Sequence, residues 1–441
     1  MCSPGPKPSP NTCAPDLRAR VFRILAGLWV WLGFVPVLLP AQAKSVLIYY
    51  HLWFSAPPHS PTWGWHWTMD RFRPDRTNAL GEQDIASWYQ PLIGTYDSGD
   101  PVVLEYHALL MRLAGADAVV VNWFGPEPVF DYATIDRRLH QLLPYLERTG
   151  LKLVLCYEDR ALQAPAPDPG HPPPSALDRA RRALQYACSA YFGRACYLRW
   201  KDRPVLLNFG PQVLRNPEDW PALVRECDPP PALFTINTPA PGAVGAFAWP
   251  PMWLSQAPGT GGVLSAAALH RYLGDFEQAA QRWPAAISCA FPRFHDIHAR
   301  AGTRPYWGYL GDRGGDTFRE TLTRALTNAI PMVMIATWNH FGEGTLIEPT
   351  REFGFRDLAL LQQLRRQWID PAFPPTTNEL AMVWQLYQLR RAARRAAHPQ
   401  TDLDAAADAL ANFRFEDARR LLQGFSRTPP EAAPESQPAR P

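Results

Sequence analysis

The stretch PMVMIAT, at residues 331–337, is an unbroken apolar run that is too short for an ordinary helix. It leads directly into WNHFGEG, at residues 338–344, which combines indole, amide, imidazole and carboxyl side chains. A short apolar run that ends at turn residues is typical of a parallel strand buried on both faces of its sheet. We therefore predict a buried strand here, with polar residues just beyond its end.

Seven earlier stretches share this character, and they are residues 46–50, 118–122, 153–157, 204–208, 233–237, 246–249 and 285–289. Helical patterns separate several of these runs, at residues 101–113, 132–148, 178–191 and 317–328. Strands that alternate with helices predict the α/β class. Eight such strands favour a (β/α)8 TIM barrel over an open sheet. The fifth and sixth runs leave room only for a short loop between them.

The chain has 441 residues, and its C-terminal part differs in character from the rest. We expect residues 44–370 to form the barrel, closed by a helix at 355–368. Helical patterns at 379–397 and 403–425 predict a helical appendage over residues 371–427. Residues 428–441 are rich in Pro, Glu and Ser, a composition that is typical of disorder.

The N-terminus has the pattern of a secretion signal. Arg18, Arg20 and Arg23 precede an apolar run at 24–39, and AQA at 41–43 supplies a small-x-small cleavage site. We expect residues 1–43 to be a signal peptide, which predicts a secreted or periplasmic protein without stable membrane insertion after cleavage. An uncleaved membrane anchor is the alternative interpretation.

The charge balance excludes some classes of partner. The chain holds 44 basic and 41 acidic residues, and removal of residues 1–43 takes away four basic and one acidic residue, which leaves no net charge. The absence of a basic excess argues against a nucleic-acid or anionic-membrane partner. Arg390, Arg391, Arg394 and Arg395 form a basic cluster in the appendage, which we interpret as a solvated helix face.

Cysteine usage is compatible with export. Among the cysteines after residue 43, Cys188 and Cys196 are the nearest candidate pair for a disulfide. Cys156 and Cys289 lie inside apolar runs and are expected in the core. The sequence contains no CxxC motif and no Cys/His set with zinc spacing, so we predict neither a metal site nor a cofactor.

Functional residues of a (β/α)8 barrel project from the C-terminal ends of its strands. The residues near those ends mix carboxylates, imidazoles, amides and indoles, which are the groups that bind sugar hydroxyls and stack on sugar faces. The substrate-binding candidates are Tyr50, His51, Trp53, Trp67, Asn122, Trp123, Glu158, Asn208, Trp338 and Asn339. Any single one of them can instead be a helix cap or a packed core residue.

Cleavage of a glycosidic bond usually needs a proton donor and a second group that handles charge. Glu343 is the acid/base candidate because Gly342 and Gly344 flank it, where the backbone can approach a ligand closely. A helix-capping role for Glu343 is the alternative. His340 is either a catalytic partner or a hydrogen-bonded structural histidine. Glu158 is too polar for the core, so it binds either a sugar hydroxyl or a charged partner.

The run ATWNHFGEGTLIEP, at residues 336–349, resembles the signature of glycoside hydrolase family 99, the endo-α-mannosidase and endomannanase family, and more loosely that of family 71. The stretches DIAS at 84–87, PLIGTY at 91–96 and DP at 100–101 resemble that family's segment after its first strand. CYED at 156–159 resembles the end of its third strand, where a glutamate contacts substrate. The likeness covers roughly residues 45–350.

The resemblance implies a metal-independent reaction that retains configuration. One glutamate draws a proton from the sugar 2-hydroxyl to give an anhydro-sugar, and a second glutamate three residues later acts as acid and then as base. Glu343 matches the second glutamate, whereas His340 stands at the position of the first. A neutral imidazole can accept a proton, so His340 is a substitute base, a mark of altered stereochemistry or a mark of lost activity.

The leading hypothesis is an endo-acting hydrolase of an α-linked polysaccharide or glycan, with Glu343 and His340 as catalytic residues. The alternative is a non-catalytic glycan-binding or envelope polysaccharide-assembly protein built on the same barrel. The departure at His340 and the helical appendage motivate this second hypothesis.

Overall fold

The computed structural model describes residues 44–165, 174–396 and 401–426, and all of them fall in one compact unit. The predicted signal peptide at 1–43 and the predicted tail at 428–441 lie outside the described residues. Within the described part of the chain, no helix is long and apolar enough to cross a membrane.

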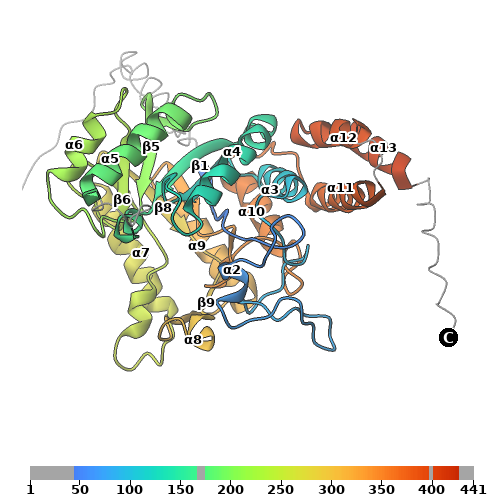
Figure 1. Ribbon diagram of the computed structural model, residues 1–441, viewed down its shortest axis with the longest axis horizontal. Helices are drawn as coiled ribbons and strands as arrows, with labels where there is room; N and C mark the ends of the chain where they lie inside the picture. Colours follow the sequence, from blue (N-terminus) through green and yellow to red (C-terminus); the bar gives the residue numbers. More distant parts are fainter. Residues whose placement is uncertain (1–43, 166–173, 397–400, 427–441) are drawn as a thin grey trace, which may run out of the picture. The chain divides into compact units, whose positions relative to one another are not determined.

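Eight parallel strands of the described chain close into a barrel (Figure 1). In chain order they are β1 (Ser45–Tyr50), β2 (Ala118–Trp123), β3 (Lys152–Tyr157), β5 (Arg203–Asn208), β6 (Ala232–Ile236), β7 (Gly245–Phe247), β8 (Ala285–Ala290) and β11 (Met332–Ile335). Each strand pairs with the next, and β11 pairs with β1, where Ile335 lies beside Ile48. The predicted (β/α)8 TIM barrel is confirmed.

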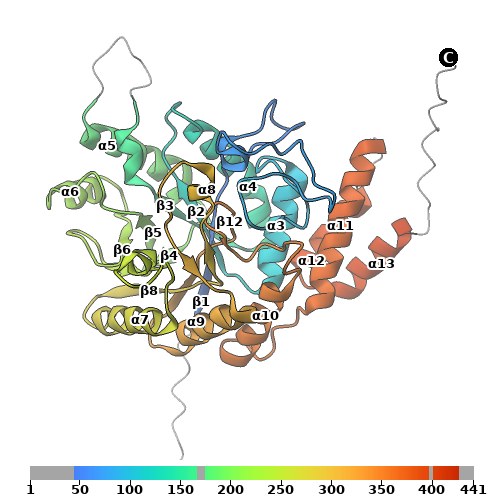
Figure 2. The ribbon, with the colours of Figure 1, turned by 90° about the horizontal axis from the view of Figure 1, so that it is seen from below.

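Helices surround the strands (Figure 2). The longer ones are α3 (Pro101–Ala114), α4 (Tyr132–Thr149), α5 (Ala176–Ala187), α6 (Asp219–Arg225), α7 (Ala266–Ala280), α9 (Asp316–Thr327) and α10 (Arg356–Trp368). The N-terminus of α3 is set by Asp100, whose side chain accepts from the Val102 N–H, and by Pro101 in the first turn. The described residues 237–244, between β6 and β7, contain no helix, which agrees with the short loop expected there.

Small elements lie in the connections outside the barrel strands. They are α2 (Trp65–Thr68), α8 (His298–Ala301), the short strand β4 (Arg199–Trp200) and the two-stranded pairs β9 (Phe294–His295) with β10 (Tyr309–Leu310) and β12 (Asn339–His340) with β13 (Thr345–Leu346). The two strand pairs matter for function, because β9–β10 shapes the loop after β8 and β12–β13 shapes the loop after β11.

Side chains alternate strictly across the wall of the barrel. In β1, Leu47 and Tyr49 pack inside the barrel, whereas Val46, Ile48 and Tyr50 pack against the helices. This alternation follows from the two-residue period of a strand. It also decides which residues near the strand ends face the mouth of the barrel.

The C-terminal helices α11 (Thr377–Ala396), α12 (Thr401–Ala411) and α13 (Phe415–Ser426) form the predicted appendage, and α11 lies beside α3 (Figures 1 and 2). Glu105 of α3 is buried and accepts hydrogen bonds from Arg390 at 2.8 and 2.9 Å and from Arg148 at 2.9 Å. Arg390 also pairs with Asp404 of α12 at 2.6 Å. A shared buried carboxylate therefore joins barrel and appendage.

The disulfide expected between Cys188 and Cys196 is wrong. Cys188 bonds to Cys227, with a Cα–Cα distance of 6.3 Å, and Cys196 is a buried free thiol. Cys188 follows α5 and Cys227 follows α6, so the packing of these two helices selects the pair rather than the spacing in sequence. Cys156 and Cys289 are buried in the core as predicted. No group of three or more potential metal ligands occurs among the described residues.

Candidate active site

A cavity of about 620 Å³ opens at the C-terminal ends of the barrel strands. Its aromatic lining consists of Tyr49, Trp53, Phe54, Trp65, Phe124, Tyr132, Phe209, Trp249, Trp253, Phe294 and Trp307. Its polar lining consists of His51, His66, Asn122, Glu158, Arg160, Gln212, Asn237, His298, Arg304, His340 and Glu343. A hollow of this size with aromatic walls and a few polar groups is the usual form of a small-molecule or sugar site.

Glu343 lies in the turn between β12 and β13, and the turn is pressed against the loop after β8. The N–H of His295 donates to the Glu343 carbonyl at 2.7 Å. Gly344 has a φ of +62°, and a Cβ there would lie 2.9 Å from the His295 carbonyl oxygen. Glycine is therefore required beside Glu343 for both its conformation and this close approach.

The Glu343 carboxylate faces two cationic or potentially cationic groups. Arg304 Nη2 lies 2.9 Å from Oε1, and His340 Nε2 lies 3.7 Å from Oε2. Burial favours the neutral acid, but His340 and Arg304 together hold the pKa of Glu343 below its ordinary value. Glu343 is therefore ionised at neutral pH when the cavity holds no substrate.

His340 is oriented by the backbone of the same turn. Its Nδ1 accepts a hydrogen bond from the Glu343 N–H at 3.2 Å, and burial lowers the pKa of the ring. A neutral imidazole that accepts at Nδ1 carries its proton on Nε2. The Nε2–H then faces the Glu343 carboxylate at 3.7 Å, which is too long for a hydrogen bond but close enough for an electrostatic contact.

Glu158 follows β3 on the interior side and has the opposite electrostatic character. Gln212 Nε2 donates to its carboxylate at 2.7 Å. Burial raises the pKa of Glu158 to about 8, and the Gln212 hydrogen bond only partly opposes this shift. The cavity thus contains one carboxyl group that keeps its proton at neutral pH and one that does not.

Trp53 forms one wall of the cavity together with three histidines. Its ring is stacked between His51, at 3.8 Å and 22°, and His66, at 4.0 Å and 4°. His340 meets the same stack edge-on, 4.7 Å from His51 and 5.0 Å from Trp53. Burial also lowers the pKa of His51, so this ring is uncharged at neutral pH.

Of the residues predicted from the sequence, His51, Trp53, Asn122, Glu158, His340 and Glu343 line this cavity. Three others lie on the outer face of the barrel wall, which corrects their expected position. Tyr50 hydrogen-bonds His107 of α3 at 2.8 Å, and Trp123 donates to Asp136 of α4 at 2.9 Å. Asn208 is fully buried outside the cavity lining. Strand alternation places their neighbours Tyr49, Asn122 and Phe209 at the cavity instead.

Trp67, Trp338 and Asn339 also lie outside the cavity lining, because they are fully buried beneath it. Trp67 donates to the Tyr96 carbonyl at 2.8 Å. Asn339 bonds both the N–H and the carbonyl of His51 at 2.9 Å, and thereby joins the loops after β1 and β11. These contacts give Trp67 and Asn339 supporting roles rather than direct contact with a ligand, and Trp338 is fully buried.

Arg304 is the most consequential residue that the sequence pattern missed. It lies in the long connection between β9 and β10, and its Nη2 bridges Glu343 and Asp296, the latter at 3.3 Å. Residues such as Arg304 and Trp307 come from loops that follow the strands at a distance. Only the folded chain shows that they reach the cavity.

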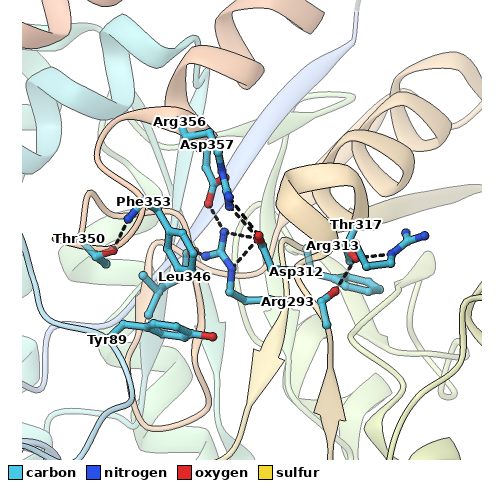
Figure 3. Close-up of polar contacts among 12 residues, drawn as sticks. Tyr89, Arg293, Asp312, Arg313, Thr317, Leu346, Thr350, Phe353, Arg356 and Asp357 are labelled. Atoms are coloured by element: carbon cyan, nitrogen blue, oxygen red, sulfur yellow. Dashed lines mark hydrogen bonds and ion pairs between the residues drawn. The ribbon is translucent and has the colours of Figure 1, made fainter.

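A buried ionic cluster anchors this connection to the turn that carries Glu343 (Figure 3). Arg293 donates to Asp312 at 3.0 Å and to the Leu346 carbonyl of β13 at 2.6 Å, and it pairs with Asp357 of α10. The Phe353 ring covers its guanidinium at 3.9 Å. The loops that carry Arg304 and Glu343 are thus joined at their bases.

Comparison with known proteins bears on both fold and family, although no family model matches the chain. A glycoprotein endo-alpha-1,2-mannosidase-like protein of Danio rerio is 33% identical over 91 residues, which cover 19% of this chain and only 20% of that protein. A protein of the same description from Mus musculus is 23% identical over 377 residues, 75% of this chain and 78% of that protein.

Solved structures give the same picture. Two structures of the GH99 endo-alpha-mannosidase from Bacteroides thetaiotaomicron match with TM-scores of 0.55 and 0.54 at 18% identity, covering 74% of this chain and 96% of theirs. The similarity confirms the barrel fold. Together with the relatives, it also confirms the resemblance to glycoside hydrolase family 99 that the motif at residues 336–349 indicated.

Proposed function

We propose that this protein is an exported glycoside hydrolase that cleaves an α-linked glycan at internal bonds, as an endo-α-mannosidase does. The names of its relatives support the reaction class, and the N-terminal signal pattern supports export. The observation that carries the proposal is the position of Glu343, a carboxylate at an aromatic-lined cavity at the C-terminal end of the barrel. That end is where barrel enzymes hold their catalytic groups.

Glu343 is the proposed acid/base. To protonate the departing oxygen it must first take up a proton, which its ion pair with Arg304 opposes. Arg304 is 35% exposed, so its side chain has room to turn away when a sugar fills the cavity. Displacement of Arg304 by substrate would raise the pKa of Glu343 at the stage when the proton is needed.

His340 is proposed to orient Glu343 rather than to serve as the base. The lone pair on Nδ1 already accepts the Glu343 N–H, which leaves Nε2–H to donate. Glu158 is proposed to donate its proton in a hydrogen bond to a sugar oxygen, because a carboxyl with a pKa of about 8 is a donor at neutral pH. The other aromatic rings of the cavity, such as Trp249 and Trp307, would stack on the sugar faces, whereas both faces of Trp53 are already covered by histidines.

The test is the substitution Glu343→Gln, assayed with a panel of α-mannans and α-glucans. We expect hydrolysis, measured as new reducing ends, to fall by at least about 100-fold, since general acid–base catalysis contributes roughly 10²–10⁴-fold. Glycan binding, measured by calorimetry, should be nearly unchanged because glutamine keeps the size of the side chain. Glu352→Gln makes the same chemical change at an exposed site outside the cavity and serves as the control.

Unchanged turnover in Glu343→Gln would refute this role for Glu343. If the wild-type protein binds glycans but releases no product at any pH, the non-catalytic glycan-binding hypothesis replaces the enzyme.

A further inference from the structure

A second cavity lies between the barrel and α11, outside the site described above. Its volume is about 430 Å³. It is lined by Pro58, His59, Asp100, Arg391, Arg394 and Arg395, and we call it the arginine pocket.

Positive charge in the arginine pocket exceeds negative charge. Arg391 and Arg394 both donate to Asp100, at 3.1 and 2.9 Å. That carboxylate also accepts the Val102 N–H at the start of α3. Arg395 forms no ion pair within the described residues. Two guanidinium groups therefore share one carboxylate that already accepts a backbone N–H, and the third has no carboxylate partner among the described residues.

The neighbouring Arg390 shows what a purely structural arginine looks like in this helix. It is buried and is balanced by two carboxylates, Glu105 and Asp404. Arg391, Arg394 and Arg395 instead lie on one face of α11 at the i, i+3, i+4 spacing, where like charges repel. They also enclose a cavity, which a solvated helix face does not require. The excess charge is thus unexplained by the fold and is suited to an anion.

The arginine pocket lies at the same end of the barrel as the cavity of Glu343. The helices of a (β/α)8 barrel begin where the strands end, so the start of α3 marks the mouth side. A single segment, residues 53–66, contributes to both cavities. Trp53, Trp65 and His66 line the Glu343 cavity. Pro58 and His59 line the arginine pocket. A ligand that extends along this segment can reach both.

We propose that the arginine pocket binds an acidic group, a carboxylate or a sulfate ester, of the glycan that enters the Glu343 cavity. This assignment rests on the proposed function and makes the substrate an acidic polysaccharide. The planar guanidinium fork matches such oxyanions and forms paired hydrogen bonds with them.

The lining of the arginine pocket favours a glycan over other polyanions. Among the described residues that form it, only Pro58 is apolar, whereas a membrane-surface site also needs apolar groups to enter the lipid. Those described lining residues also include no Phe, Tyr or Trp on which a nucleic-acid base would stack.

The test measures binding to the full-length protein by calorimetry, with three probes: polygalacturonate oligomers, sulfated dextran and neutral mannan. In the double variant R394Q/R395Q, we expect affinity for one or both acidic probes to fall at least tenfold, and affinity for neutral mannan to stay the same. The control R419Q/R420Q removes two charges from the exposed face of α13, where both arginines pair with acids of their own helix. It should bind all three probes like the wild type, and thermal unfolding should show that both variants are folded.

Equal affinity of R394Q/R395Q and wild type for the acidic probes would overturn the proposal. So would binding of inorganic sulfate as tight as that of the polymers, which would indicate a site for a free ion. Arginine-dependent binding to phosphatidylglycerol vesicles, without binding to acidic glycans, would indicate a membrane site and also overturn it. Hydrolysis of a neutral α-mannan by the wild-type protein is the separate readout of the proposed function.

Discussion

Replacement of Arg304 by glutamine should raise the pKa of Glu343. Arg304 Nη2 lies 2.9 Å from the carboxylate, and hydrogen bonds to charged groups contribute about 1.5–3 kcal/mol. One pKa unit corresponds to about 1.4 kcal/mol, so the full effect would be about 1–2 units. Because the Arg304 side chain is 35% exposed, solvent screens part of this interaction, and we expect a rise of about 1 unit.

The pH dependence of kcat/KM should report this change, since it reflects the ionisation of the free enzyme. As a proton donor, Glu343 loses activity as the pH rises above its pKa. A higher pKa therefore shifts the alkaline limb of the profile upward by about 1 pH unit in R304Q. Carboxyl ¹³C NMR, with E343Q to assign the resonance, measures the same pKa without relying on activity.

Arg300→Gln is the matched control, because Arg300 lies over Trp88 at 5.1 Å and forms no ion pair with Glu343 among the described residues. Its profile should match that of the wild type. If the Glu343 resonance titrates at the same pH in R304Q and wild type, the electrostatic reasoning is refuted. If the resonance shifts but the activity profile does not, Glu343 is not the proton donor.

Two further predictions concern stability. Burial raises the pKa of Glu158 from 4.5 to about 8, so the stabilising protonated form is complete below pH 4.5 and is lost as the pH rises toward 8. Glu158→Gln has no such loss. One pKa unit corresponds to about 1.4 kcal/mol, so urea unfolding should show the variant gaining up to about 5 kcal/mol relative to wild type between pH 4.5 and 8; parallel pH curves would contradict this. The bond between Cys188 and Cys227 closes a separation of 39 residues, so Cys188→Ser should lower the free energy of unfolding by about 4 kcal/mol. Reductant should destabilise the wild type by a similar amount and leave the variant unaffected, and an equal response of both proteins would argue against the bond.

The barrel could be predicted from the sequence because its strands are short, apolar and regularly separated by helices. The positions of Glu343, His340 and Glu158 followed from the same pattern together with the motif at residues 336–349. The prediction of site residues from strand ends did not take into account that side chains alternate between the inside and the outside of the barrel along each strand. Leu47 and Val120 point inward, which places Tyr49 and Asn122, not Tyr50 and Trp123, at the cavity.

Other features depend on contacts that no local pattern encodes. Arg304 reaches Glu343 because the β9–β10 connection folds back over the barrel mouth, and Cys188 meets Cys227 because α5 packs beside α6. Both are long-range consequences of packing. Spacing in the sequence favoured Cys196 over Cys227 as the disulfide partner of Cys188. It gave no indication that Arg304 contacts Glu343.

The contact between α3 and the C-terminal helices has a consequence for the evolution of the protein, because the barrel and the appendage share the ion pairs of Glu105. Glu105 is an anion deep within the protein, and one of its two counter-ions, Arg390, comes from beyond the last barrel helix. In a shortened protein that ends at residue 370, water would replace Arg390 beside Glu105, but the apolar face of α3 that α11 covers, including Tyr106, would be exposed to solvent. Loss or exchange of the helices by recombination would therefore require simultaneous changes on the apolar face of α3, so the two parts are expected to be inherited together.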